Sequence, residues 1–166
     1  MVEETASSAR SNILWGLFAA AMGAFIVAGA CNLFGLNMHP TKDTPSWIGI
    51  CAGLIFVAGG LAVILQSLPV AKPMPDGGLS PNAPRWVQGI SLALGLFIVG
   101  GLAAVGLWIA FGPGERHFSS NLPFMSGPAN DTLGRVVFGI GAVLTCLAFL
   151  AFLVSGARRL LRREKV

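Results

Sequence analysis

Ionisable residues are missing from the four longest apolar runs of this chain. The runs cover residues 13–36, 47–68, 86–111 and 136–154, and none of them contains Asp, Glu, Lys, Arg or His. Ionisable side chains inside a membrane usually mark ion paths, proton relays or ligand counter-ions, because their burial in hydrocarbon is costly. Their absence argues against a proton-coupled exporter that depends on an intramembrane carboxylate.

Metal- and cofactor-binding residues are also scarce. The two histidines, His39 and His117, fall between the apolar runs, so neither is placed to ligate a haem within a helix. The three cysteines form no CxxC pair, which argues against a membrane thiol oxidoreductase. Cys31 and Cys51 are predicted near the same membrane face, so a disulfide between them is geometrically possible. No catalytic, cofactor or metal site is predicted.

Apolar sequence is what the chain has in abundance. Hydrophobic residues make up 54% of the 166 residues and charged residues 11%. Each run has about the 20 residues that a helix needs to cross a bilayer. We therefore predict an all-α integral membrane protein, a single domain over residues 1–166, with transmembrane helices at about 13–36, 47–68, 86–111 and 134–157 in a compact four-helix bundle. Residues 1–12 are predicted to be a polar tail. One alternative stays open, because the small residues before Cys31 resemble a signal-peptidase site, and cleavage there would leave three spans.

The basic residues predict the orientation. With both termini in the cytoplasm, the inner segments carry eight basic residues (Arg10, Lys72, Arg85 and five in the tail 158–166) and the outer loops carry three, Lys42, Arg116 and Arg135. This asymmetry follows the positive-inside rule, and the four tryptophans fall at predicted helix ends, where aromatic belts form. We expect a multi-pass protein of a bacterial inner membrane. Its basic C-terminal tail would meet anionic headgroups, and nucleic acid is not an expected partner.

Small residues predict how the helices associate. Lipid tails are as apolar as leucine, so close backbone approach at small residues drives helix contacts in membranes. The chain has 22 glycines, and many recur at spacings of three and four along the runs. The glycines predicted at helix contacts are Gly16, Gly23, Gly49, Gly53, Gly100 and Gly141. Such stripes either close the bundle or leave one face for another membrane subunit or a second copy.

The best polar cluster lies in the second outer loop. Glu115, Arg116 and His117 follow the third run, and Arg135 lies at the outer start of the fourth helix. If this loop folds back, Glu115 can pair with Arg135 as a structural latch across the mouth of the bundle. A catalytic or binding role for this outer-face cluster is the weaker interpretation.

The function predicted from these features is non-enzymatic. The leading hypothesis is an accessory, assembly or scaffolding subunit of a larger membrane complex, since close-packing surface is abundant and reactive groups are few. The first alternative is a small transporter or channel for an uncharged or lipophilic compound. The second is an enzyme whose site forms in the outer loops around Glu115 and His117.

Overall fold

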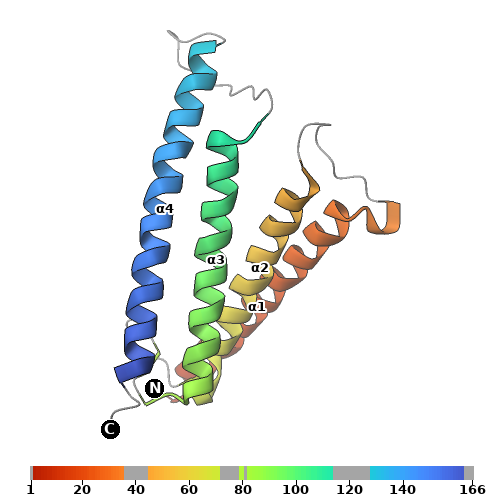
Figure 1. Ribbon diagram of the computed structural model, residues 1–166. Coiled ribbons are helices and arrows are strands. Elements are labelled where there is room, and N and C mark those ends of the chain that lie inside the picture. Colours follow the sequence, from red (N-terminus) through yellow and green to blue (C-terminus); the bar gives the residue numbers. More distant parts are fainter. Residues whose placement is uncertain (1, 36–44, 72–78, 81, 114–127, 163–166) are drawn as a thin grey trace. The chain divides into compact units, whose positions relative to one another are not determined.

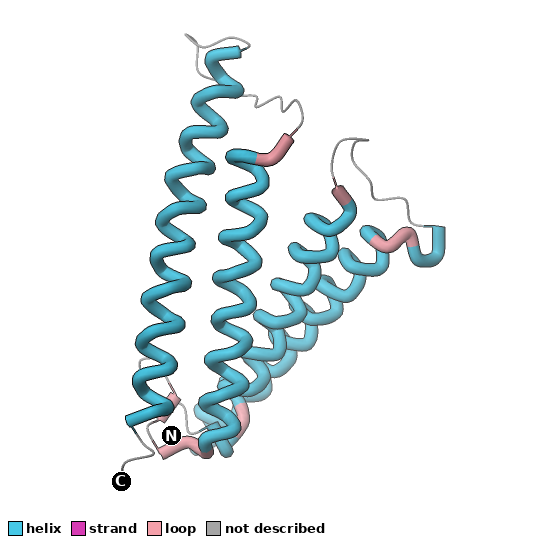
Figure 2. The backbone as a smooth tube through the Cα atoms, in the orientation of Figure 1, coloured by secondary structure: helices cyan, strands magenta, loops and turns pink. Residues whose placement is uncertain are grey.

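Four long helices account for most of the chain. The computed structural model describes residues 2–35, 45–71, 79–80, 82–113 and 128–162, and their regular elements are helical (Figures 1 and 2). The elements are α1 (Val2–Ala30), the 3₁₀ turn η1 (Leu33–Gly35), α2 (Ser46–Ser67), the 3₁₀ turn η2 (Pro69–Ala71), α3 (Arg85–Phe111) and α4 (Pro128–Arg162). Each long helix contains a stretch long and apolar enough to cross a membrane. The prediction of an all-helical protein with four such helices is confirmed.

The ends of α1 differ from the prediction. The predicted helix continued to residue 36, but α1 ends at Ala30. Asn32 takes the left-handed conformation with φ of 54°, and the Asn32 N–H donates to the carbonyl of Gly29 at 3.1 Å. Asparagine is one of the few residues that adopt this conformation readily, and it ends helices as glycine does. At the other end, residues 2–12 are helical, whereas a polar tail was predicted.

Proline and nearby polar groups set the beginnings of α3 and α4. The Asn82 N–H donates to the Ser80 hydroxyl at 3.2 Å, and the chain then enters α3 just after Pro84. The Gln88 side chain reaches back and donates to the Ala83 carbonyl at 2.8 Å. Pro128 begins α4, at the helix position where a missing N–H costs least. Helix α4 is therefore longer at both ends than the predicted 134–157.

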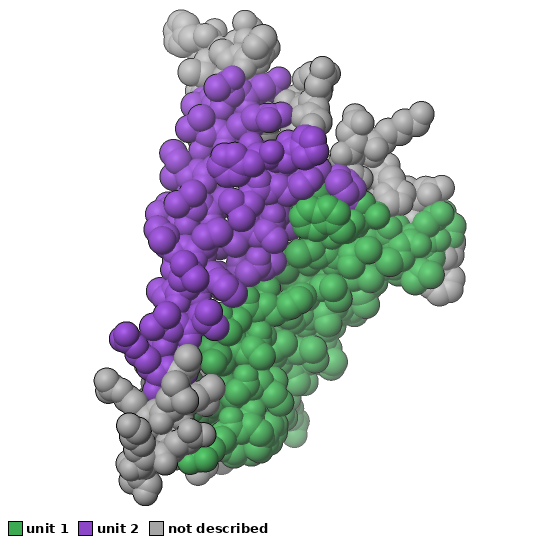
Figure 3. Space-filling view, in the orientation of Figure 1, with its two compact units in different colours: residues 1–39, 46–98 green, residues 40–45, 99–166 purple. Residues whose placement is uncertain are grey.

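The chain divides into two compact units, coloured separately in Figure 3. Unit 1 contains residues 1–39 and 46–98, and unit 2 contains residues 40–45 and 99–166. In unit 1, α1 and α2 lie side by side (Figure 1). The start of α3 packs against the end of α2 through Val87, which is fully buried and clusters with Leu65 and Ala71. The helices of unit 2 are the second half of α3 and the whole of α4.

In the described helices small residues are buried and large apolar residues are exposed, which is the reverse of the pattern in a soluble protein. Alanines and glycines dominate the buried positions of the described helices, whereas leucines and phenylalanines are widely exposed. Phe18 on α1 is 59% exposed and Leu144 on α4 is 61% exposed. Apolar surface of this extent exceeds the patches that soluble monomers expose. It fits helices whose outer faces contact lipid tails and whose contacts with each other use small residues.

Candidate functional site

Two reciprocal glycine pairs hold α1 against α2 in unit 1. A Cβ on Gly23 would lie 2.5 Å from the Gly53 carbonyl oxygen, and a Cβ on Gly53 would lie 2.7 Å from the Gly23 carbonyl oxygen. Gly16 and Gly60 repeat the arrangement, since a Cβ on either would collide with the carbonyl oxygen of the other. No larger residue fits at these four positions unless the backbones move apart. The two helices therefore touch main chain to main chain.

The glycine contacts recur along the two helices because the small residues are spaced regularly in the sequence. Gly16, Gly23 and Ala30 are seven residues apart on α1, and Gly53 and Gly60 are seven apart on α2. Seven residues make nearly two helical turns, so each set lies along one seam, and this period is typical of left-handed helix pairs. The pairing runs in opposite directions on the two helices, which makes α1 and α2 an antiparallel hairpin. At the end where the chain connects the two helices, a Cβ on Gly49 would lie 2.9 Å from the Ala30 Cβ.

Helices α3 and α4 make a looser contact in unit 2. A Cβ on Gly106 would lie 3.2 Å from the Ala142 Cβ, and a Cβ on Gly100 would lie 3.1 Å from the Phe149 ring. A Cβ on Gly139 would lie 3.6 Å from the Phe111 ring, which is ordinary van der Waals contact. Here each glycine faces a side chain of the other helix, in contrast with the contacts between main-chain atoms of α1 and α2.

Gly141 does not lie at the contact between α3 and α4. The sequence predicts it on the inner face of the fourth helix, and within unit 2 it is exposed, with nothing within 4 Å of an added Cβ. Gly139 and Ala142 take its place at the contact with α3. Neighbouring helical residues differ by about 100° in direction, so a shift of one or two positions turns a glycine away from its partner.

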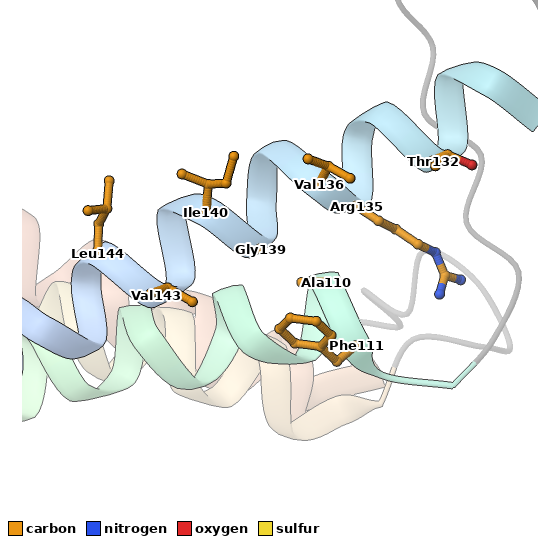
Figure 4. A pocket seen from close by; sticks show the side chains of 9 residues that line it. All are labelled: Ala110, Phe111, Thr132, Arg135, Val136, Gly139, Ile140, Val143 and Leu144. Atoms are coloured by element: carbon orange, nitrogen blue, oxygen red, sulfur yellow. The ribbon is translucent and has the colours of Figure 1, made fainter.

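A groove lies along α3 and α4 in unit 2. It has a volume of about 480 Å³. Nearly all of its lining is apolar, and the residues are Ala110, Phe111, Thr132, Arg135, Val136, Gly139, Ile140, Val143 and Leu144. Figure 4 shows Phe111 at the end of α3 and Arg135 extending from α4 at the same end of the groove. The groove is thus apolar along its length and cationic at one end.

Only one member of the predicted polar cluster lies in the described part of the chain. Arg135 is half-buried and lines the groove. Glu115, Arg116 and His117 fall outside the described residues, so the latch between Glu115 and Arg135 stays a prediction. Asp131 lies one helical turn before Arg135, and both residues have interaction partners in the structure.

The hydroxyl groups within the helices bond to their own backbone. The Thr145 hydroxyl donates to the Gly141 carbonyl at 2.7 Å, and the Ser155 hydroxyl donates to the Ala151 carbonyl at 2.7 Å. These bonds satisfy the hydroxyls without a partner helix, as is common for such residues in apolar helices. Among the residues that the structure describes, no group of three or more His, Cys, Asp or Glu side chains lies together.

The cysteines are present as thiols, so the structure contains no bond between Cys31 and Cys51. Cys31 is exposed just beyond the end of α1, and Cys51 is half-buried in the first turns of α2.

Sequence reasoning missed the groove and the contacts of Gly106 and Gly139. The sequence signal for Gly139 was its spacing of three residues from Ala142, which puts two small residues on neighbouring positions of one face. The groove had no sequence signal, because its lining comes from two helices and its residues are ordinary for a membrane span.

Comparison with known proteins provides no family for this chain: no family model matches it, and neither the curated proteins nor the solved structures include a significant match.

Proposed function

We propose that this protein is a non-enzymatic, multi-pass protein of a bacterial inner membrane that serves as an accessory, assembly or scaffolding subunit of a larger membrane complex. The observation that supports this best is the α1–α2 hairpin. The four glycines of its reciprocal pairs make contacts within the hairpin, and large apolar side chains such as Phe18 and Phe56 are exposed. A stiff hairpin with a broad apolar outer face offers neighbouring helices a fixed surface.

The chemistry of the spans also supports a subunit without catalysis of its own. The four apolar runs have no ionisable residue, and the hydroxyls of Thr145 and Ser155 are engaged with the helix backbone. A reaction inside the membrane needs a nucleophile with a base or a metal ion. A role in holding other chains needs only shape and apolar surface.

We further propose that both termini lie in the cytoplasm. Eight of the eleven basic residues would then be on the inner side, five of them in the tail 158–166. In that topology the tail lies against anionic headgroups, where each basic residue adds about 1 kcal/mol of attraction.

Extraction in a mild detergent followed by mass spectrometry of the co-purifying proteins tests the subunit hypothesis. We expect one or more membrane proteins in stoichiometric amounts, also recovered after crosslinking in intact cells. A monomer or homo-oligomer that transports a lipophilic compound in liposomes would overturn the proposal.

The groove of unit 2 favours one alternative function, a transporter or channel for an uncharged or lipophilic compound. Its volume of about 480 Å³ lies within the range of small-molecule sites, and its walls are apolar. Transport by purified protein in liposomes, abolished by a bulky residue at Val143, would support this alternative. Loss of function on changing Glu115 or His117 with assembly intact would instead indicate an enzyme site in the outer loop.

A further inference from the structure

The groove of unit 2 is polar at one end and apolar along the rest of its length, an arrangement that matches the two parts of a lipid. Arg135 and Thr132 lie toward one end, and Val136, Ile140 and Leu144 continue along α4 away from them. The cation lies within the first turns of the apolar segment Asp131–Gly156, so it falls near one edge of that segment. A ligand that fits this arrangement has one anionic end and one long apolar part.

The length of the groove matches half a bilayer. Nine residues separate Arg135 from Leu144, which corresponds to about 13 Å along the helix axis at about 1.5 Å per residue. The hydrocarbon core of a bilayer is about 30 Å thick, so one leaflet is about 15 Å deep. A chain that begins at the level of Arg135 therefore ends near the middle of the membrane, where an acyl chain ends.

The charge at one end of the groove favours a lipid over a helix. Arg135 lies where the groove begins, and the lining beyond it is apolar. A phospholipid has one phosphate followed by an apolar chain, which matches this order. The apolar runs of a second copy contain no acidic residue, so such a helix would bring no anion to Arg135.

Arginine suits a phosphate at this position. Its guanidinium has five N–H donors and binds phosphate oxygens in a bidentate manner. It can do so while it keeps another partner, which matters because Arg135 already has an interaction and Asp131 lies one turn away. The long side chain can also extend toward the interface while its stem stays in apolar surroundings.

We propose that the groove between α3 and α4 binds one anionic glycerophospholipid, with an acyl chain along Val136, Ile140 and Val143 and the headgroup phosphate on the Arg135 guanidinium. This is a single bound lipid, distinct from the general attraction between the basic tail and anionic headgroups. It does not depend on the proposed role as a subunit of a complex.

Lipid binding to the purified full-length protein tests the proposal. The protein is stripped of lipid in detergent and titrated with phosphatidylglycerol or with phosphatidylcholine of the same chains, and the dissociation constant of the first bound lipid is measured by native mass spectrometry. We expect Arg135→Gln to weaken phosphatidylglycerol binding about tenfold and phosphatidylcholine binding much less. Arg135→Lys should keep most of the affinity because the charge remains.

Two further variants separate the groove from other surfaces. Arg158→Gln removes an exposed cation farther along α4 and should leave the first binding constant unchanged. Val143→Phe fills the groove from a side chain that is 50% exposed, so the fold is spared, and it should weaken both lipids. Equal losses in Arg135→Gln and Arg158→Gln would overturn the proposal, as would no effect of Val143→Phe. Displacement of phosphatidylglycerol by glycerol 3-phosphate would also overturn it, since the chain would then be dispensable.

Discussion

Replacement of Gly53 by alanine adds a single methyl group to a main-chain contact between α1 and α2. That Cβ would lie 2.7 Å from the Gly23 carbonyl oxygen and 2.9 Å from the Val27 backbone nitrogen. Both are main-chain atoms of α1, so no side-chain rotation relieves the collision. The helices themselves must move.

The size of the effect follows from these distances. Ordinary van der Waals contact for a Cβ begins at 3.4 Å, so α1 and α2 must separate locally by about 0.7 Å, which is 3.4 minus 2.7. A gap of this size forfeits about a quarter to a half of each neighbouring dispersion contact. Overpacking by one methyl group typically costs about 1–3 kcal/mol. Alanine recovers up to about 1 kcal/mol through its higher helix propensity.

Gly59→Ala is the matched control, because Gly59 lies on the same helix and a Cβ there would meet nothing within 4 Å. It gains the same helix propensity without the collision, so the difference between the two variants isolates the packing effect. We expect Gly53→Ala to be less stable than Gly59→Ala by about 1–3 kcal/mol. The assay is unfolding by added SDS in mixed micelles, followed by circular dichroism and by energy transfer between labels on α1 and α2.

Equal stability of the two variants would refute the reasoning, because only Gly53 faces the backbone of α1. Gly53→Ile would enlarge the separation and should break the hairpin contact. If its inter-label transfer matches that of the unsubstituted protein, the helices do not meet at this glycine.

Three further predictions concern other parts of the molecule. Gly106→Val should be less stable than Gly141→Val in the same SDS titration, since only Gly106 faces a neighbouring helix. Equal unfolding midpoints of the two variants would contradict the contact between Gly106 and Ala142. In a variant without other thiols, exposed Cys31 should react with a membrane-impermeant maleimide in intact cells with a permeabilised outer membrane, whereas Asn82→Cys should react only after lysis; the opposite pattern would invert the proposed topology. Gln88→Leu should lower the free energy of unfolding by about 1 kcal/mol, because a part-buried hydrogen bond at the start of α3 is lost, and no change would show that water replaces it.

The number and position of the helices could be predicted because they depend on local properties. Run length and hydropathy are enough to recognise a span, so α2 and α3 begin and end within one residue of the predicted 47–68 and 86–111. The end of α1 escaped prediction because apolar residues continue past Ala30, and the left-handed turn at Asn32 has no hydropathy signal. The polar residues at the start of α1 are likewise compatible with a helix that extends beyond the apolar segment.

The sequence by itself determined that this protein has four apolar helices rich in small residues and without ionisable groups in their long apolar runs. Only the tertiary structure decided which small residues are in contact. Gly53 and Gly59 look alike in the sequence, as do Gly139 and Gly141, yet one of each pair faces a helix and the other does not. A helix that is apolar all round has no polar face to fix its rotation. Its orientation is therefore set by shape, through the carbonyls and methyl groups that meet across each contact, and the groove beside Arg135 is a consequence of that fit.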